Sequence, residues 1–372
     1  MARARRLALI AASAALAAGS LAAAGCGGDD DSGAASDTSG GGAAASDVSG
    51  TIAGAGASSQ DAAMEAWIAG FQQANPGATI SYDPVGSGGG REQFVAGGTV
   101  FGGTDAHLAD EELTGAQERC GGVNNLIEIP VYVSPIAVAY NLPGVEGLNL
   151  SAETLAKIMK REITKWNDPA IAADNPDASL PDTDITTVSR SDESGTTENF
   201  QEYLKAAAPS VWTYEVDGNW PVKGGEAAQG TSGVVDAISA GEGTIGYADA
   251  SQVADLGVAN IGVGGTFVPP SPEAAAAILE ESPQTDDRGD YVFTYDLKRD
   301  TTAEGVYPIV LVSYEMACTQ YSSAQDAAVV KPFLSWIIST EGQQAAASAA
   351  GSAPLSPQIQ TLIQPAVDAI QG

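Results

Sequence analysis

The chain has 372 residues and carries 47 acidic against 16 basic side chains, for a formal net charge of −31 at pH 7. A chain this acidic is a poor nucleic-acid binder, because affinity for a phosphate backbone comes from Lys and Arg, and it has little attraction for anionic lipid. One histidine and three cysteines exclude most zinc sites and argue against a Ser-His-Asp hydrolase.

Residues 1–25 have the pattern of an export signal. A basic start is followed by the apolar stretch 7–24, and small residues lead into a cysteine. The sequence Ala23-Ala24-Gly25-Cys26 resembles a bacterial lipobox, in which the cysteine becomes the lipidated first residue of the mature chain. We therefore predict an exported protein that is anchored through Cys26 to the outer face of the cell membrane. The alternative is a plain secretory signal in which this cysteine is incidental.

Residues 26–50 are predicted to form a disordered tether. They consist mainly of Gly, Asp, Ser and Ala, and such a segment cannot bury enough apolar surface to offset the entropy lost on ordering. A flexible segment behind a lipidated cysteine would hold a folded body away from the membrane.

Cys120 and Cys318 are the two cysteines that remain if Cys26 carries a lipid. In an oxidising compartment an even number of cysteines indicates pairing, so we predict a disulfide bond between these two. Two buried free thiols are the alternative.

The folded body, residues 51–372, alternates short apolar runs with amphipathic stretches, which is typical of an α/β protein. The predicted strands are 51–53, 78–82, 99–103, 126–140, 185–189, 244–247 and 306–314. The predicted helices are 60–74, 91–96, 151–172, 194–208, 226–240, 327–340 and 358–370.

Two long apolar strand regions, near 134–142 and 306–314, bracket the middle of the chain. A protein whose chain crosses twice between two lobes would have this pattern. We therefore predict lobe I from residues 51–137 plus 308–372, and lobe II from residues 138–307.

Three predicted strands end in turns rich in Gly, Ser and Thr, and a helix is predicted to follow each turn. The turns contain Ser58-Ser59, Gly86-Ser87-Gly88 and Ser194-Gly195-Thr196. Glycine lets the backbone approach a ligand closely, serine and threonine offer hydroxyl donors, and the N–H groups at a helix start attract anions. One such turn is an ordinary helix cap, but three in one chain indicate an anion site.

Arg190 lies at the end of a predicted strand, shortly before the third turn. Its planar guanidinium suits two-point binding of an oxyanion, and Asp192 is close enough to orient and partly neutralise it. The alternative is a surface ion pair of Arg190 with Asp192 or Glu193.

Asp105 follows the predicted strand 99–103 and is unexpected in an anion site. If it faces the ligand, its carboxylate must accept a hydrogen bond from that ligand. Phosphate near neutral pH keeps a proton and sulfate does not, so an ionised Asp105 would bind phosphate and repel sulfate. Sites built around one specific hydrogen bond reject an analogue that lacks it by roughly 10⁴–10⁵. The alternative is an ordinary turn residue.

Six short motifs follow one another along residues 51–372. They are Gly54-Ala55-Gly56-Ala57-Ser58, Gly86-Ser87-Gly88-Gly89-Gly90, Thr104-Asp105-Ala106-His107-Leu108, Thr164-Lys165-Trp166-Asn167-Asp168-Pro169-Ala170-Ile171, Asn175-Pro176 and Arg190-Ser191-Asp192-Glu193-Ser194-Gly195-Thr196. Together they resemble the phosphate-binding lipoproteins and periplasmic proteins of ABC-type phosphate importers. The resemblance covers essentially all of the folded body.

The resemblance implies a two-lobed periplasmic-binding-protein fold, type II-like, with two mixed sheets flanked by helices and phosphate in the cleft between the lobes. It implies that Asp192 supports Arg190. It implies phosphate contacts from Ser58, Ser59, Ser87, Asp105, Arg190, Ser194, Gly195 and Thr196. It also implies a monomer without catalytic activity, cofactor, metal or nucleic acid, whose partners are inorganic phosphate and the membrane permease subunits of an importer.

Four positions depart from the family pattern. The family usually has Thr-Phe where this chain has Ser58-Ser59, and often a second serine where it has Gly88. A glycine is common where this chain has Glu193, which we expect to bring a negative charge near the anion.

Other functions fit the residues less well. A receptor for another oxyanion or a phosphate sensor would carry the same turns. A nucleotide-binding oxidoreductase would use Gly54-x-Gly56-x-x-Ser59, but the third glycine is absent. A secreted phosphatase would need a base beside a nucleophile, and His107 has no serine near it in sequence. Residues 182–193 are spaced like a calcium-binding EF-hand loop, but such a loop requires a glycine at the position that Thr187 occupies.

Overall fold

The computed structural model describes residues 48–253 and 255–372. The chain divides into two units, residues 1–44 and 45–372, and all of the elements below belong to the second unit. The predicted export signal, Cys26 and nearly all of the predicted tether lie outside the described residues. Within residues 48–253 and 255–372, no helix combines the length and the apolar character needed to cross a membrane.

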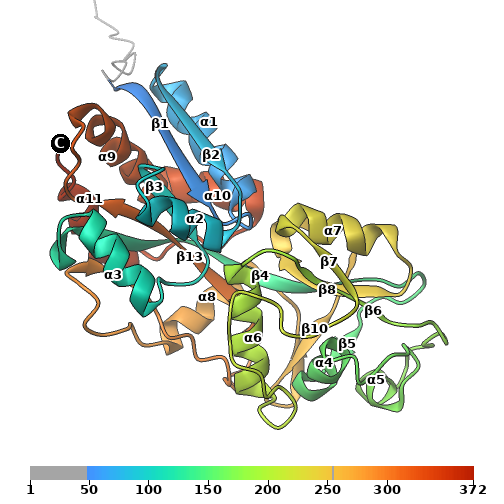
Figure 1. Cartoon of the computed structure of the whole chain (residues 1–372). Helices are drawn as coiled ribbons and strands as arrows, with labels where there is room; N and C mark the ends of the chain where they lie inside the picture. The colour runs from blue at the N-terminus through green and yellow to red at the C-terminus, as the bar shows by residue number, and fades with distance from the viewer. Residues whose placement is uncertain (1–47, 254) are drawn as a thin grey trace, which may run out of the picture. The chain divides into compact units, whose positions relative to one another are not determined.

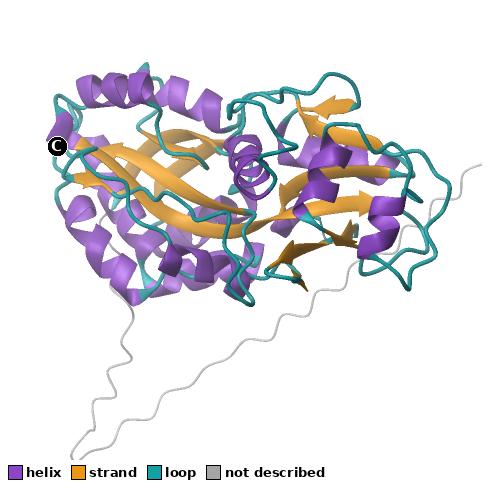
Figure 2. Cartoon of the chain, turned by 90° about the horizontal axis from the view of Figure 1, so that it is seen from below, coloured by secondary structure: helices purple, strands orange, loops and turns teal. Residues whose placement is uncertain are grey.

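The strands form one large mixed sheet and one small sheet (Figures 1 and 2). They are β1 (Ser49–Gly56), β2 (Gly77–Asp83), β3 (Phe101–Thr104), β4 (Leu126–Asn141), β5 (Asn149–Leu150), β6 (Thr186–Arg190), β7 (Glu226–Ala228), β8 (Thr244–Asp249), β9 (Gly257–Val258), β10 (Asn260–Val263), β11 (Thr266–Val268), β12 (Tyr291–Val292) and β13 (Val310–Cys318). The large sheet has the order β2-β1-β3-β13-β4-β8-β6-β7, and the small sheet has the order β11-β10-β5.

Helices cover the two halves of the large sheet (Figure 2). They are α1 (Asp61–Ala74), α2 (Ser87–Val95), α3 (Asp110–Arg119), α4 (Ala152–Met159), α5 (Pro169–Asp174), α6 (Gly195–Ala207), α7 (Gly230–Ala240), α8 (Pro272–Glu281), α9 (Ala324–Ile338), α10 (Thr340–Ala350) and α11 (Pro357–Asp368). Short 3-10 helices occupy Val123–Asn125 and Ala250–Gln252.

Strand β4 joins the two halves of the sheet. Up to Pro135 it pairs antiparallel with β13, and from Ile136 to Asn141 it pairs antiparallel with β8. β1 to β3 lie on the β13 side, whereas β6 and β7 lie on the β8 side. The predicted two-lobed α/β fold is confirmed, and a continuous strand connects its halves.

The predicted lobe boundaries remain a prediction. β12 belongs to the segment that the sequence analysis placed in lobe II, yet it pairs with Ile127 and Glu128 of β4. Those two residues lie in the half of β4 that pairs with β13, so this segment packs on the first half of the sheet.

Several predicted elements were wrong in extent. The helix predicted over 151–172 is two helices, because α4 ends near Arg161, whose φ is 63°, and Pro169 opens α5. The helix predicted over 226–240 begins with strand β7. The strand predicted over 306–314 starts only at Val310 and runs on to Cys318. Helices α3, α8 and α10 were not predicted.

The predicted disulfide between Cys120 and Cys318 is present, with an S–S distance of 1.97 Å. Cys120 follows α3, and Cys318 ends β13. Both sulfurs belong to a small buried cluster that includes Phe94, Leu108 and Met316. The bond ties helix α3 to the sheet over a sequence separation of 198 residues.

Candidate functional site

Three helices begin around Asp105. Ser59 precedes α1, Ser87 opens α2, and Thr196 lies in the first turn of α6. The side chains of all three residues are hydrogen-bonded to Asp105, and all four residues are buried. Because the first N–H groups of a helix have no partner within it, this arrangement gathers backbone donors from α1, α2 and α6 in one place.

The carboxylate of Asp105 accepts three hydroxyl hydrogen bonds. Ser59 Oγ (2.6 Å) and Ser313 Oγ (2.7 Å) donate to Oδ1, and Thr196 Oγ1 (3.0 Å) donates to Oδ2. Each carboxylate oxygen accepts about two hydrogen bonds. These bonds therefore fill Oδ1 and leave Oδ2 with room for one further donor.

The backbone N–H and carbonyl groups of Asp105 are also hydrogen-bonded to side chains. Its N–H donates to Ser87 Oγ at 3.1 Å, and its carbonyl oxygen accepts from Asn199 Nδ2 at 2.7 Å. Asn199 lies on α6 and Ser87 on α2. Elements from both halves of the sheet thus position one buried carboxylate.

Arg190 and Asp192 form the predicted pair. Arg190 Nε donates to Asp192 Oδ1 at 2.8 Å, and Nη2 donates to Oδ2, so the contact is two-point. Asp192 Oδ1 also accepts from the N–H of Gly230. Burial opposes ionisation of Asp192, but the hydrogen bonds and the charge of Arg190 lower its pKa below the ordinary value.

Two glycines are required where the turns meet. Gly86 has a φ of 97°, and a Cβ added there would lie 2.6 Å from Asp192 Oδ2 and 3.2 Å from Arg190 Nη2. A Cβ on Gly195 would lie 2.8 Å from Ser87 Oγ and from the Cβ of Asp105. These short distances show that the second and third predicted turns pack against each other and against Arg190.

Ser58 and Ser194 complete the set of predicted site residues. Ser58 Oγ accepts a hydrogen bond from the N–H of Thr231 at 3.1 Å, and the Ser58 carbonyl accepts from Gln252 Nε2. Ser194 caps α6 by accepting from the N–H of Thr197 at 3.2 Å. The structure therefore brings all eight predicted contact residues into one buried region.

Sequence reasoning missed Ser313, Thr231, Asn199 and Arg91 in this region. Ser313 lies inside the apolar strand β13, and Thr231 and Asn199 lie on helices α7 and α6. None of the four stands in the three turns that carried the sequence argument. Ser313 stands beside Tyr314 in the buried strand β13, and a serine in such a strand is not a specific signal of a binding site.

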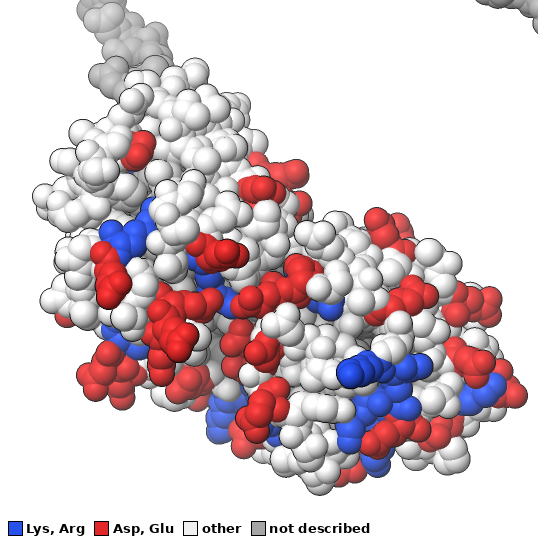
Figure 3. All heavy atoms as spheres, in the orientation of Figure 1, with Lys and Arg blue, Asp and Glu red and all other residues white. Residues whose placement is uncertain are grey.

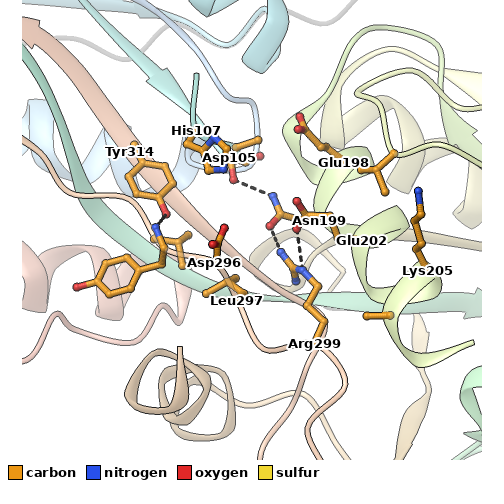
Figure 4. Close-up of a pocket in the computed structure, with 15 residues that line it drawn as sticks. Asp105, His107, Glu198, Asn199, Glu202, Lys205, Asp296, Leu297, Arg299 and Tyr314 are labelled. Atoms are coloured by element: carbon orange, nitrogen blue, oxygen red, sulfur yellow. Dashed lines mark hydrogen bonds and ion pairs between the residues drawn. The ribbon is translucent and has the colours of Figure 1, made fainter. Parts of the chain in front are cut away.

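A cavity of about 330 Å³ opens beside Asp105. Figure 4 shows Asn199 between Asp105 and Arg299, and Arg299 is paired with Glu202 at 2.8 Å. Glu198 also lines this cavity, and burial raises its pKa to about 7. His107 lies here as well, with Nδ1 3.3 Å from the carbonyl of Leu108. Among the described hydrogen bonds, none joins His107 to a serine.

Metal ligands are not assembled here. Within residues 48–253 and 255–372, no group of three or more His, Cys, Asp or Glu side chains could hold a metal ion.

Glu315 is a second buried carboxylate near this region. It lies on β13 opposite Gly103, and a Cβ on Gly103 would approach Tyr82 Oη and Gln60 Nε2. In the part of the chain that the structure describes, neither carboxylate oxygen of Glu315 has a hydrogen-bond partner. Burial raises the pKa of Glu315 from 4.5 to about 8, so the folded protein holds this group protonated at pH 7.

Replacing Glu315 with glutamine is expected to stabilise the protein in a pH-dependent way. The unfolded chain ionises Glu315 near its ordinary pKa, so the wild type loses stability as the pH rises from there toward the folded-state pKa. The advantage of Glu315→Gln should therefore grow by about 2–3 kcal/mol between pH 5 and pH 7. Denaturant unfolding of both proteins across this range measures it. If the difference in free energy of unfolding between the two proteins did not change with pH, Glu315 would not be buried and protonated in the folded state.

The fold and the buried cluster define a class: a two-lobed α/β protein in which three helices begin around one buried carboxylate at the junction of the two halves of its sheet. A sequence model described as a PBP superfamily domain matches residues 41–341. Phosphate-binding protein PstS 3 of Mycobacterium tuberculosis is 37% identical over 324 residues, which cover 86% of each chain. Phosphate-binding protein PstS of Xylella fastidiosa is 32% identical over 304 residues, which cover 79% of each chain. The chain belongs to the PBP superfamily and, within it, to the PstS family.

Solved structures share the fold. A periplasmic phosphate-binding protein called PfluDING, solved with phosphate, has a TM-score of 0.67 at 21% identity and covers 85% of this chain and 93% of its own. A phosphate-binding protein from Stenotrophomonas maltophilia has a TM-score of 0.65 at 20% identity, with coverages of 85% and 94%.

Proposed function

We propose that the protein is an extracytoplasmic receptor that binds inorganic phosphate and delivers it to the membrane permease subunits of an ABC importer. The PstS relatives support this function by their names. The observation that carries the proposal is Asp105, a buried carboxylate with one free acceptor position, set among three helix N-termini. A carboxylate acceptor surrounded by N–H donors suits an anion that retains a proton.

Binding would use the predicted residues as one set. Arg190, held by Asp192, supplies the positive charge, and the N–H groups and hydroxyls of the three turns supply neutral donors. Oδ2 of Asp105 would accept a hydrogen bond from the protonated oxygen of phosphate, because Oδ1 already accepts from Ser59 and Ser313. Sulfate has no proton to offer, so its oxygens would face an unpaired charge.

The departures at Ser59 and Glu193 fit this scheme. Ser59 stands where the family has an aromatic residue, and its hydroxyl donates to Asp105 Oδ1. Glu193 makes an ion pair with Arg91 at 2.7 Å, so its charge is compensated away from Arg190.

No covalent step belongs to the proposed function. The lobes, proposed as 51–137 plus 308–372 and 138–307, would close on the ion by a hinge motion of the kind periplasmic binding proteins use. Cys26 would carry the lipid after removal of residues 1–25, and residues 26–50 would tether a monomeric body to the membrane. A phosphate sensor would use the same site, and the transport role rests on the PstS relatives.

Calorimetry of residues 27–372, freed of bound phosphate, tests the proposal. We expect one phosphate ion to bind per chain and sulfate to bind far more weakly, because only phosphate can donate to Oδ2 of Asp105. Incubation with an aryl phosphate ester should release no phosphate. Sulfate binding of comparable affinity would contradict the role of Asp105, and steady ester hydrolysis would favour the phosphatase alternative.

A further inference from the structure

Arg91 is a buried arginine that contacts both halves of the molecule. It lies on α2, and its side chain is only 4% exposed. Its Nε donates to Glu112 Oε1 at 2.8 Å and its Nη1 to Thr104 Oγ1 at 3.1 Å. Its Nη2 donates to Glu193 Oε1 at 2.7 Å. All three nitrogens of the guanidinium therefore have a defined partner.

The partners of Arg91 fall into two groups. Thr104 ends β3 and Glu112 lies on α3, and both elements belong to the β13 side of the sheet together with α2. Glu193 lies between β6 and α6, and β6 pairs with β8 on the other side. Of the three contacts that Arg91 makes, only the one with Glu193 spans the two halves, so it is the Arg91 contact that opening of the lobes would break.

Glu193 fits closely against α2. A Cβ on Gly88 would lie 2.5 Å from Glu193 Cδ, and a Cβ on Gly218 would lie 2.8 Å from Glu193 Cγ. The side chain of Glu193 is thus seated between two glycines, one from each half of the molecule. Acidic and basic atoms lie close together along the junction of the two halves in Figure 3.

The ion pair is directly coupled to the phosphate site. Thr104 precedes Asp105, and Glu193 precedes Ser194, the cap of α6. A movement that separates Glu193 from Arg91 would also withdraw the third turn from Asp105, because Thr196 and Asp105 are joined across the same junction.

We infer that Arg91 and Glu193 form a latch that holds the phosphate-loaded lobes closed and slows the release of phosphate. This inference rests on the proposed function. Glu193 is a positioning residue for closure and not a contact of the ion. Because its side chain is 46% exposed, solvent screens the pair, and Arg91 keeps two other partners when the lobes part. The contribution is therefore moderate.

The off-rate of phosphate from residues 27–372 tests the latch. Radiolabelled phosphate is bound and then chased with unlabelled phosphate. Glu193→Gln should release it about three- to tenfold faster, as expected for loss of a partly screened ion pair. In the background of Arg91→Gln, the same substitution should have little further effect, because the partner is already gone.

Salt and a matched control separate a latch from a structural role. The wild-type off-rate should rise with ionic strength more steeply than that of Glu193→Gln. Glu215→Gln removes an ion pair of 2.8 Å with Lys205 inside one half and should leave the off-rate unchanged. The melting temperature without phosphate should be the same for Glu193→Gln and the wild type.

Three outcomes would overturn the inference. An unchanged phosphate off-rate in Glu193→Gln would refute the latch without contradicting the proposed phosphate binding. A lowered melting temperature without phosphate, with parallel salt dependence of the off-rates, would make the pair a general stabiliser. Failure of the wild type to bind phosphate at all would overturn the proposed function, and the latch with it.

Discussion

Asp105→Asn is expected to lower the ratio of phosphate affinity to sulfate affinity by at least about 100-fold, because in the proposed scheme one charged acceptor discriminates between the two ions. The substitution preserves shape but replaces the free acceptor position with an N–H donor. Phosphate loses the partner of its proton, while sulfate gains a donor where it met an unpaired negative charge. Calorimetric titration of both ions against both proteins measures the ratio.

Asp192→Asn is the matched control for this experiment. It removes the same charge from a carboxylate that is hydrogen-bonded to Arg190 and does not face the proton of the ligand in the proposed scheme. It should change the affinities for phosphate and sulfate in the same direction, with a nearly constant ratio. A constant ratio in Asp105→Asn as well would refute selection by proton acceptance.

Removal of the disulfide should lower the free energy of unfolding by about 3–5 kcal/mol. The bond between Cys120 and Cys318 spans 198 residues, so its loss gives the unfolded chain much more conformational freedom. For a body of this size the melting temperature should fall by about 5 °C. Denaturant unfolding of the double variant Cys120→Ala and Cys318→Ala against the wild type measures the change.

Phosphate affinity serves as the internal control for the disulfide variant. The bond lies in the small cluster with Phe94 and Met316, and none of the eight predicted contact residues belongs to that cluster. The variant should therefore bind phosphate as the wild type does. Equal unfolding midpoints for the two proteins would contradict the prediction, because they would show that the disulfide does not contribute to the free energy of unfolding.

The strong negative charge of the chain is compatible with anion binding because the site acts locally. Acidic side chains are spread over the face shown in Figure 3, but at physiological salt the screening length is about 8 Å. In the proposed binding mode, Arg190 and the helix N-termini would lie close to the ion, and the surface carboxylates would be screened from it. We therefore expect the overall negative charge to slow the approach of phosphate more than it weakens the retention of bound phosphate.

The sequence alone determined the parts of this protein that depend on local chemistry. The turns at Ser58, Ser87 and Ser194 could be predicted, because glycine and hydroxyl residues at a strand-to-helix junction are typical of a turn followed by a capped helix. The disulfide was predicted from the number of cysteines that remain if Cys26 is lipidated behind the predicted export signal. The α/β class followed from alternating apolar periods.

Only the tertiary structure decided which distant residues complete the site. Ser313 reaches Asp105 because β13 runs antiparallel to β3 and β4, and the residues of one strand do not specify which distant strand it pairs with. Arg91 and Glu193 meet across the junction of the two halves, and either would pass for a surface charge in the sequence. Such contacts depend on how separate elements pack, which local sequence does not encode, whereas turns and caps depend on residues a few positions apart.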